Sequence, residues 1–492
     1  MDRERKKRIR TIKLIVTEII MTIVVVAAVI VLTFVAMGYN VNKDGDLAQS
    51  GLLQVRSIPS GATVEIDDEV MLAHTNMSKM LSAGNHNLKL SKEGYDTWSK
   101  EITAESGWLL KIEYPRLFLK DRTMEKVREY DNQIENMSFS EDGSRALYNI
   151  AGDRYWTLLD IASDDISETK LNLEEALGSN VVREIFWNDN NEKVLMRTKN
   201  SDKNEWILVN LKNPSESFNV TQEFGLDFSK VRFLTGAGDR LVTLENNNLR
   251  IITVNGKTVS GILASSVDDF YNDGTTLAYV GNYTFKDYAK EQAFLLKEST
   301  ESESDGISSD TPIKAIMIYQ DSAEDVFVAG AKSDRRMQVA LSEYLGKKYL
   351  MIALDNSLLV YRGEYPNSTR QGLADMELIL EEKLTSVPDA LTVWSDEQLM
   401  MARNGAEVAM FDAELSKLSQ YTLGSDMVFI VSDYLLGNIV DGKLSVLDFD
   451  GQNLRELAKT DSSAVISRNN KWLYYDLTVD GKTNIFREKI IE

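Results

Sequence analysis

The sequence of 492 residues contains no cysteine. Disulfide bonds, thiolate metal sites and cysteine nucleophiles are therefore excluded, and so is attachment of a lipid through a cysteine side chain. The absence leaves the cellular compartment open, because exported proteins of many organisms also fold without disulfide bonds.

Histidine is nearly as scarce, since the chain has only His74 and His86. Both precede the long C-terminal part of the chain, so that part can contain neither a Ser-His-Asp triad nor a histidine-ligated metal site. The Gly-x-Ser-x-Gly motif of α/β catalytic domains is also missing. We expect His74 and His86 to be loop residues, with a catalytic role as the weaker alternative.

A net positive charge is found at the N-terminus, whereas the rest of the chain is strongly acidic. Residues 1–13 hold seven basic and two acidic residues, which gives them a net charge of +5. Because the whole chain carries −21, residues 14–492 carry −26. Such an acidic body repels phosphate backbones, which argues against nucleic acid as a partner and leaves solubility or cationic partners as explanations. No glycine-rich phosphate loop joins a strand to a helix, so no nucleotide or other cofactor is expected.

One long apolar run stands out, because residues 19–37 contain 19 consecutive residues without a charge. A helix rises roughly 1.5 Å per residue and a hydrocarbon core is about 30 Å thick, so residues 14–37 are predicted to form a transmembrane helix. A cleaved signal peptide is the alternative. Its apolar region is shorter and ends in a small-residue pattern that residues 35–38 lack.

The flanking charges predict the orientation of this helix. Seven basic residues precede it, and Lys43 alone follows within the next dozen residues. By the positive-inside bias, residues 1–13 form a cytoplasmic tail and the bulk of the chain lies outside the cell membrane. Residues 38–50 are polar and lack periodicity, which predicts a linker.

After residue 50 the sequence alternates apolar and polar residues in two short segments, LLQVRSIP and TVEID. This alternation predicts two strands that pair as a hairpin. Pro59 lacks an amide hydrogen and suits the end of a strand, and Gly61 suits a turn with positive φ. A third alternating segment follows Gly84.

These residues resemble the PEGA domain over residues 51–116. The landmarks of the resemblance are structural: Pro59, Gly61, Ala62, Gly84, Gly94 and Tyr95. The Thr-Pro pair usual between the second and third strands is replaced by Thr75-Asn76, which puts the conformation of that loop in question. The resemblance implies a small β-sandwich-like module of the bacterial cell envelope, without chemistry of its own.

A recurrent phrase fills the rest of the chain, in which an aromatic or apolar residue and a short polar turn precede an apolar strand. FSEDGSRALY and ISRNNKWLY are clear copies. The turns are centred near residues 143, 190, 238, 274, 346, 396, 433 and 469. Most intervals are roughly 36–50 residues, which is the period of a propeller blade.

The phrase resembles that of TolB-like and related WD-repeat-like bacterial propellers. We therefore expect a mainly β protein in which residues 117–492 form a seven- or eight-bladed β-propeller, closed by strands from both of its ends. The long interval after residue 274 contains a serine- and carboxylate-rich stretch, residues 298–312, which predicts a disordered loop. One short helix is a candidate, at Ala374 to Lys383.

Few residues suggest chemistry. Asp448 to Asn453 suggests calcium, but the EF-hand spacing is missing and Asp-Gly is the ordinary signal for a hairpin turn. Five tryptophans fall at strand starts, where packing between blades is favoured over stacking on sugars: Trp156, Trp187, Trp206, Trp394 and Trp472. We assign no catalytic, cofactor-binding or metal-ligating residue.

Two functions remain. The first is a non-catalytic envelope protein, anchored in the membrane through residues 14–37, whose propeller binds or scaffolds a protein or glycan partner. The alternative is an extracytoplasmic polysaccharide hydrolase or lyase that uses carboxylates in the propeller funnel. A catalytic pair would converge in the funnel with at least one raised acid pKa, whereas a scaffold would have scattered carboxylates there.

Overall fold

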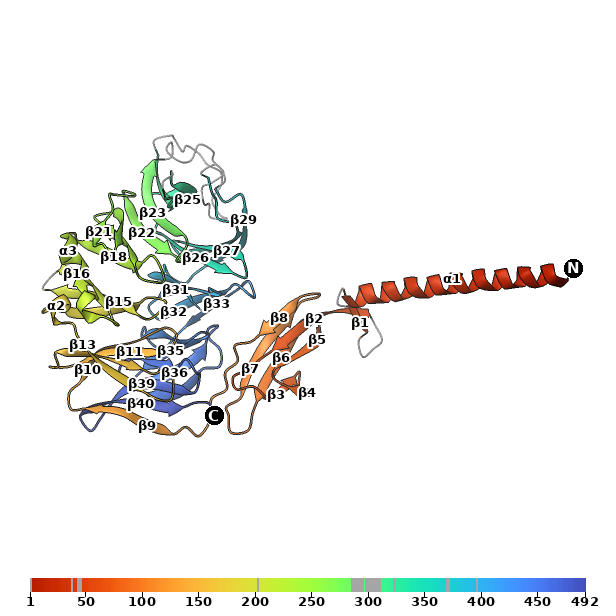
Figure 1. Ribbon diagram of the computed structural model, residues 1–492, viewed down its shortest axis with the longest axis horizontal. Helices are drawn as coiled ribbons and strands as arrows, with labels where there is room; N and C mark the ends of the chain where they lie inside the picture. Colours follow the sequence, from red (N-terminus) through yellow and green to blue (C-terminus); the bar gives the residue numbers. More distant parts are fainter. Residues whose placement is uncertain are drawn as a thin grey trace. The chain divides into compact units, whose positions relative to one another are not determined.

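The computed structural model describes residues 2–36, 39–41, 47–200, 203–284, 296, 311–321, 324–368, 372–394 and 397–492. The chain divides into two compact units, which are treated separately below. Unit 1 comprises Met1–Asp121 with Ile491–Glu492, and unit 2 comprises Arg122–Ile490. Strands predominate in both units (Figure 1).

Unit 1 begins with helix α1, Asp2–Ala36. Its described side chains, at residues 15–30, 32 and 33, are nearly all apolar and exposed. In the part of the chain that the structure describes, no helix has an apolar stretch long enough to cross a membrane. The transmembrane helix predicted for residues 14–37 is therefore not supported, because a span needs about 20 apolar residues in succession. The side chains of the predicted tail, residues 1–13, lie outside the described residues.

Strands replace part of the predicted linker. Strand β1, Tyr39–Val41, pairs with the start of strand β2, Leu47–Val55, so the linker prediction for residues 38–50 is wrong at these positions. Backbone pairing stabilises the polar segment without apolar alternation, which is why periodicity gives no sign of it. Residues 42–46 lie outside the described residues.

Two four-stranded sheets form the rest of unit 1. In the first sheet, β2 lies between β5 and β8 and also pairs with β1. In the second sheet, the order is β4-β3-β6-β7. The strands not yet bounded are β3 Thr63–Ile66, β4 Glu69–His74, β5 Met77–Ser82, β6 Gly84–Ser91, β7 Trp98–Ala104 and β8 Leu109–Ile112. Each sheet buries one face, with Leu53 and Val55 on one and Val64, Leu88 and Trp98 on the other.

The predicted hairpin between the first two strands of this module is wrong. Strand β2 pairs with β5 and β8, whereas β3 pairs with β4 and β6. The turn at Pro59–Ala62 carries the chain from one sheet to the other. Alternation identifies a strand with one buried face, but it does not specify the partner strand.

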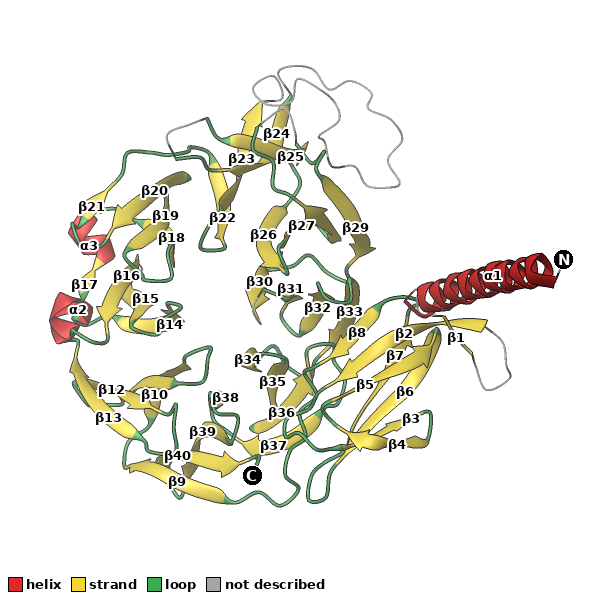
Figure 2. Cartoon of the chain, turned by 45° about the vertical axis from the view of Figure 1, so that its right-hand side comes forward, coloured by secondary structure: helices red, strands yellow, loops and turns green. Residues whose placement is uncertain are grey.

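Unit 2 is a β-propeller of eight four-stranded antiparallel sheets within the described residues. Figure 2 shows these blades in a ring, with the first strand of each blade innermost. The first four blades contain β10 Ile134–Phe139, β11 Arg145–Ile150, β12 Tyr155–Asp160 and β13 Ser167–Asn172; β14 Val181–Trp187, β15 Lys193–Asn200, β16 Lys203–Asn210 and β17 Phe218–Asn219; β18 Phe228–Phe233, β19 Arg240–Glu245, β20 Asn248–Thr253 and β21 Thr258–Val259; β22 Val267–Asn272, β23 Leu277–Thr284, β24 Pro312–Ile318 and β25 Val326–Lys332.

The other four blades have the same order. They contain β26 Met337–Tyr344, β27 Lys347–Leu354, β28 Ser357–Gly363 and β29 Met376–Lys383; β30 Ala390–Trp394, β31 Leu399–Asn404, β32 Glu407–Asp412 and β33 Lys417–Thr422; β34 Val428–Ser432, β35 Leu435–Val440, β36 Lys443–Asp448 and β37 Arg455–Lys459; β38 Ala464–Ile466, β39 Trp472–Val479, β40 Lys482–Lys489 and β9 Met124–Tyr130. Short helix α2, Glu174–Leu177, follows β13 in the connection from the first to the second blade, and short helix α3, Val220–Phe224, follows β17 in the connection from the second to the third.

Strand β9 closes the ring. It comes from the start of unit 2 and pairs antiparallel with β40, so the eighth blade is built from both ends of the propeller sequence. The predicted closure is therefore confirmed. The apolar core lies between neighbouring blades: one cluster joins Leu147 of the first blade to Val194 and Ile207 of the second. A single blade would leave these faces exposed.

The repeated phrase marks the same place in every blade. We call the connection between the first and second strands of a blade its first turn. Seven of the eight predicted turn centres lie in such turns. The eighth, residue 396, lies outside the described residues. The long interval reflects an insertion between β23 and β24. Of the predicted loop 298–312, residues 298–310 lie outside the described residues, and Pro312 already belongs to β24.

The helix predicted at Ala374 to Lys383 is wrong. Met376–Lys383 forms β29, the outermost strand of the fifth blade, and pairs with β28. Its leucine-, glutamate- and lysine-rich sequence has a high helix propensity, but pairing with β28 overrides that local preference.

The first turn of the first blade approaches the eighth blade closely. Gly143 has a φ of +64°, and a Cβ atom there would lie 2.0 Å from the carbonyl oxygen of Ile466. The carbonyl of Gly143 also accepts a hydrogen bond of 3.1 Å from the amide of Arg468. Glycine is therefore required both by the backbone conformation and by the contact between blades.

We predict that Gly143→Ala lowers the free energy of unfolding by more than about 2 kcal/mol, because the left-handed conformation and the clash both disfavour the folded state. Gly274→Ala is the matched control. Gly274, in the first turn of the fourth blade, has a φ of +89°, and no heavy atom lies within 4 Å of an added Cβ. This substitution should cost only about 1–2 kcal/mol. Urea unfolding followed by tryptophan fluorescence measures both, and equal losses would contradict the role of the contact.

Candidate functional site

The first turns of the first, second, fourth and eighth blades are capped by their own side chains. In the first blade, Ser140 Oγ accepts hydrogen bonds from the amides of Ser144 and Arg145, at 3.2 and 2.9 Å. Asp142 Oδ1 accepts from the Ser144 amide at 3.0 Å and from Ser140 Oγ at 2.8 Å. Short polar side chains thus satisfy backbone amides that the strands leave unpaired. This explains why the repeated phrase places serine, aspartate or asparagine before glycine or asparagine.

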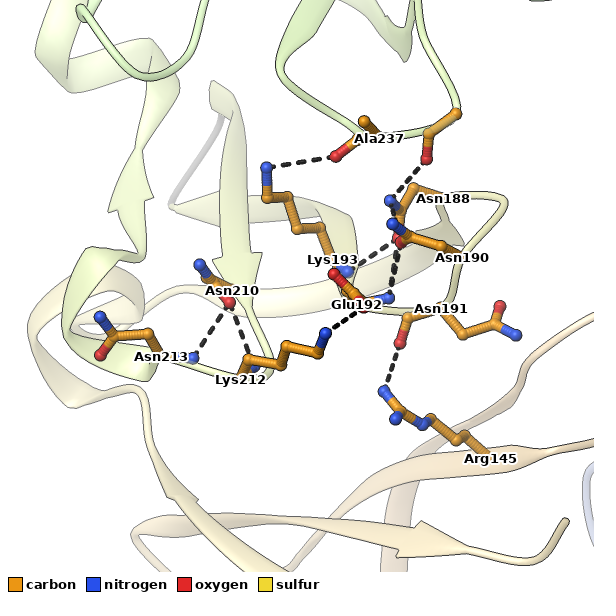
Figure 3. A network of polar contacts seen from close by, with 11 residues as sticks. Arg145, Asn188, Asn190, Asn191, Glu192, Lys193, Asn210, Lys212, Asn213 and Ala237 are labelled. Atoms are coloured by element: carbon orange, nitrogen blue, oxygen red, sulfur yellow. Dashed lines mark hydrogen bonds and ion pairs between the residues drawn. The ribbon is translucent and has the colours of Figure 1, made fainter.

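The first turn of the second blade uses asparagine for the same purpose and also contacts the first and third blades (Figure 3). Asn188 Oδ1 accepts from the amides of Glu192 and Lys193, at 3.0 and 2.8 Å, and Asn188 Nδ2 donates to the carbonyl of Gly236 in the third blade at 2.9 Å. Arg145 of the first blade donates to the carbonyl of Asn191 at 2.6 Å. Three neighbouring first turns are therefore fixed relative to one another.

A cavity of about 290 Å³ opens among the first turns. The first, second, sixth and seventh blades all contribute residues to it. Its lining combines four carboxylates, two asparagines, two tryptophans and one isoleucine: Glu141, Asp142, Trp187, Asn188, Asp189, Asn191, Trp394, Ile430 and Asp433. Among the described residues, no basic side chain lines it. We call this the first-turn cavity.

Glu141 is the electrostatically unusual residue of the cavity. Its side chain retains solvent exposure, yet surrounding protein desolvates it and raises its pKa above the ordinary 4.5, and the carboxylates of Asp189 and Asp142 raise the pKa further. Burial also opposes ionisation of Asp142, but hydrogen bonds from Ser144 and Ser140 outweigh that effect and lower its pKa. Two neighbouring carboxyl groups thus have pKa values shifted in opposite directions.

The negative potential extends toward other first turns. Burial raises the pKa of Tyr271 on β22, and the carboxylates of Asp273, Glu397 and Glu141 raise it further. These three acids belong to the fourth, sixth and first blades. Carboxylates of several blades therefore act on the same region of the ring, where they favour a cation over an anion.

The described residues contain no cluster of three or more histidine, aspartate or glutamate residues arranged to hold a metal ion. The Asp448–Asn453 segment forms the connection from β36 to β37. Asp448 is buried, and its Oδ2 accepts a hydrogen bond of 2.8 Å from Asn453 Nδ2. The hairpin-turn interpretation of this segment is confirmed.

The tryptophans divide between core and cavity. Trp156 and Trp206 belong to apolar clusters between neighbouring blades, and Trp472 is buried with its indole donating 2.8 Å to Asp164. Packing between blades is confirmed for Trp156, Trp206 and Trp472, because Trp472 belongs to the cluster that joins the first and eighth blades. Trp187 also packs against the cluster between the first and second blades. Trp187 and Trp394 line the first-turn cavity, where their indole nitrogens donate to Ser138 Oγ and to the carbonyl of Asp433.

The predicted structural residues of unit 1 do not converge on a site. Gly61, Gly84 and Gly94 all have positive φ, Gly84 is the first residue of β6, and Tyr95 is buried. Pro59 lies in the turn between the sheets. Ala62, three residues later, donates a hydrogen bond of 2.9 Å from its amide to Thr75 Oγ1. Ser57 Oγ hydrogen-bonds the same Thr75 hydroxyl at 2.6 Å, so Thr75 closes the loop that the sequence left in question.

The two histidines lie on strands, so the loop prediction is wrong for both. His74 ends the edge strand β4 and is exposed. His86, on β6, lies 2.6 Å from Asp67 through Nδ1 and 2.8 Å from the Ser82 carbonyl through Nε2. Both partners are acceptors, so the ring satisfies both only when each nitrogen carries a proton. Burial opposes protonation of His86, but the hydrogen bonds to Asp67 and Ser82 raise its pKa above 6.5.

Sequence reasoning missed the cavity carboxylates. Glu141, Asp189 and Asp433 occupy the repeated phrase, where they look like ordinary turn residues. The available signal was their equivalent place in the phrase, because equivalent turns of a propeller lie at one end of the ring. The number of blades and the way in which the ring closes decide which turns approach one another across the ring. The repeated phrase specifies neither.

Comparison with known proteins supports the first module. Residues 50–115 match the PEGA domain family model, so the resemblance predicted over residues 51–116 is confirmed. The chain thus combines a PEGA domain with a β-propeller. No curated protein matches the sequence significantly.

Many solved structures are similar to the propeller. An oligogalacturonate lyase in complex with manganese has 11% identity and a TM-score of 0.39, covering 73% of this chain and 98% of its own. The Cps50 (Swd1) β-propeller domain of Myceliophteria thermophila has 10% identity and a TM-score of 0.36, covering 74% and 99%. Porphyromonas gingivalis dipeptidyl peptidase 4 has 12% identity and a TM-score of 0.43, covering 71% and 56%. At these values the likenesses carry no argument about function.

We predict that Glu141→Gln leaves the melting temperature unchanged or raises it, with a gain that grows as pH rises from 4.5. A raised carboxyl pKa means that the folded state holds more protons than the unfolded state in this range, so wild-type stability falls with rising pH. Thermal unfolding across pH measures the difference. Glu382→Gln, at an exposed site on β29, is the control and should show no such trend; a pH-independent loss for Glu141→Gln would contradict the assignment.

We predict that His86→Asn destabilises the chain more below pH 6.5 than well above it. The raised pKa of His86 contributes stability that is complete below the unfolded-state value and is lost as pH rises through the folded-state value. His74→Asn, at an exposed position on β4, should be neutral throughout. Equal losses for His86→Asn at low and high pH, measured by thermal unfolding, would show that the ring acts only by packing.

Proposed function

We propose that this chain is a non-catalytic protein of the cell envelope, anchored through residues 14–37 and placed outside the membrane. Its propeller binds a protein partner through the first-turn cavity. The observation that carries the binding role is the composition of this cavity, which joins four carboxylates and two tryptophans without a basic residue.

The proposed anchorage rests on the sequence and on the exposed surface of α1. Residues 19–37 carry no charge, and seven basic residues precede them. The described side chains of α1 are apolar around the whole circumference, with Thr17, Glu18, Thr22 and Thr33 as the exceptions. Such a helix is unfavourable in water and favours an apolar environment.

The cavity suits a cationic side chain. Lysine and arginine are attracted to tryptophan faces and to carboxylates, and both interactions strengthen where water is partly excluded. Acidic glycans would be repelled by Glu141, Asp142, Asp189 and Asp433. A basic segment of a protein therefore fits the cavity better than an acidic polysaccharide does. Because the pKa of Glu141 is raised, its carboxyl group ionises more fully as pH rises, and binding of a cation should strengthen with pH.

One observation favours the alternative of a carboxylate-dependent polysaccharide hydrolase or lyase. Glu141 and Asp142 have pKa values displaced in opposite directions, as an acid and a base in one site would. They are, however, successive residues of one turn. The paired hydrogen bonds from Ser140 and Ser144 also give Asp142 a structural role in that turn.

We predict that the full-length protein in nanodiscs binds a lysine-rich peptide and does not bind a glutamate-rich peptide of equal length. Asp189→Asn should weaken binding about ten-fold, the effect of losing one charge-assisted contact, and Glu382→Gln should leave it unchanged. Isothermal titration measures the affinity, which should rise with pH and fall with salt.

Polysaccharide cleavage provides the opposing outcome. If the protein releases new chain ends from acidic or neutral polysaccharides, and Glu141→Gln abolishes that release while Glu382→Gln does not, then the alternative holds. Equal affinity for lysine-rich and glutamate-rich peptides would also overturn the proposed binding site.

A further inference from the structure

Unit 1 carries an exposed apolar row on the outer face of its first sheet. Leu52 on β2 is 38% exposed, and its direct neighbours in register are Met80 on β5, 38% exposed, and Leu109 on β8, 43% exposed. Residues in register on adjacent strands point to the same face of a sheet, so these three side chains form a continuous row. Trp108, which precedes Leu109, is 68% exposed. We call Leu52, Met80 and Leu109 the apolar row.

The indole of Trp108 is exposed on a fixed backbone. The Gly107 amide donates to the Ser50 carbonyl at 3.0 Å, and the Leu52 amide donates to the Trp108 carbonyl at 2.9 Å. The loop also approaches β2 so closely that a Cβ atom on Gly51 would lie 2.5 Å from the carbonyl oxygen of Glu105. The exposure of Trp108 is therefore built into the fold and does not result from a loose loop.

The polarity of this face changes along β2. Beyond Leu52, the same face presents Gln54 beside Lys111, and then Arg56, which pairs with Glu113 at 3.3 Å. Toward the start of β2, the same face carries Ser50, which is in register with Ser82 on β5. The apolar side chains therefore form a short band across the middle of the sheet, and the charged residues lie on its Arg56 side.

The apolar row lies a short distance along the chain from α1. Helix α1 ends at Ala36, and Tyr39 of β1 is paired with Gln49 of β2. Three residues from Ala36 to Tyr39, one interstrand step and three residues from Gln49 to Leu52 span at most roughly 25–30 Å. Leu52 is therefore within that distance of the C-terminal end of the helix.

We propose that the apolar row docks on the lipid bilayer at the boundary between headgroups and acyl chains, and so holds the PEGA domain against the membrane surface. This inference rests on the membrane anchorage of the proposed function. Tryptophan is enriched at that boundary because its ring is apolar and its N–H seeks a polar partner. The apolar row supplies the apolar area, the exposed Trp108 next to Leu109 in the chain supplies such a ring, and Lys111 supplies a cation for the headgroups.

The absence of cysteine permits a direct test, since one introduced cysteine accepts a unique label. Full-length Met80→Cys, carrying an environment-sensitive fluorophore, is reconstituted in phosphatidylcholine liposomes with and without doxyl-labelled lipid. Leu72→Cys is the matched control, because Leu72 is apolar and 103% exposed but lies on β4 of the other sheet. Lipid should quench the label at residue 80 several-fold more than the label at residue 72.

Three further variants separate the possible failures. Val29→Cys reports on α1: if its label is quenched and that at residue 80 is not, the anchorage stands and the docking is overturned. If neither is quenched, the anchorage itself fails. Trp108→Ser should reduce quenching at residue 80 several-fold without changing the circular dichroism, and Leu109→Asn should do the same independently. Shielding of residue 80 from an aqueous quencher without lipid quenching would identify a protein interface and overturn the proposal.

Discussion

The structure of unit 2 depends on the burial of sheet faces between neighbouring blades. Each blade has apolar residues on both faces, and the clusters that contain Leu147, Val194 and Trp206 all lie between blades. Such faces are buried only when the ring is complete, because an incomplete ring would leave two of them in water. The pairing of β9 with β40 is therefore the contact on which the remaining blades depend.

The closed ring also determines what the turns do. Their serine, aspartate and asparagine side chains satisfy local amides, so the turns hold their shape without a covering layer. The intervening side chains then remain available. Glu141 and Asp189 are such residues, and the ring brings them together with Trp394 and Asp433 from the sixth and seventh blades. The proposed site is thus a product of ring geometry acting on ordinary turn residues.

Periodicity in the sequence was sufficient to place the blades. Seven of the eight predicted turn centres are described residues between the first two strands of a blade, and in the first, second, fourth and eighth blades polar residues of the phrase cap backbone amides there. The PEGA landmarks were found for a similar reason, since Gly61 and Gly94 occupy positive φ. Pairing partners were less accessible: β2 and β3 lie in different sheets, and β29 is a strand despite a helix-favouring sequence. These outcomes depend on distant segments.

The cavity was not predictable, because it joins residues 141 and 433, which are distant in the chain, and because desolvation of Glu141 depends on walls supplied by other blades. A consequence follows from the self-capped first turns. A self-capped turn has much of its hydrogen bonding within its own residues, so a substitution at an outward position that makes no contact with a neighbouring turn need not disturb the strands or the other blades. The rim of the ring can therefore diverge one loop at a time, which would let relatives with the same scaffold acquire different recognition properties.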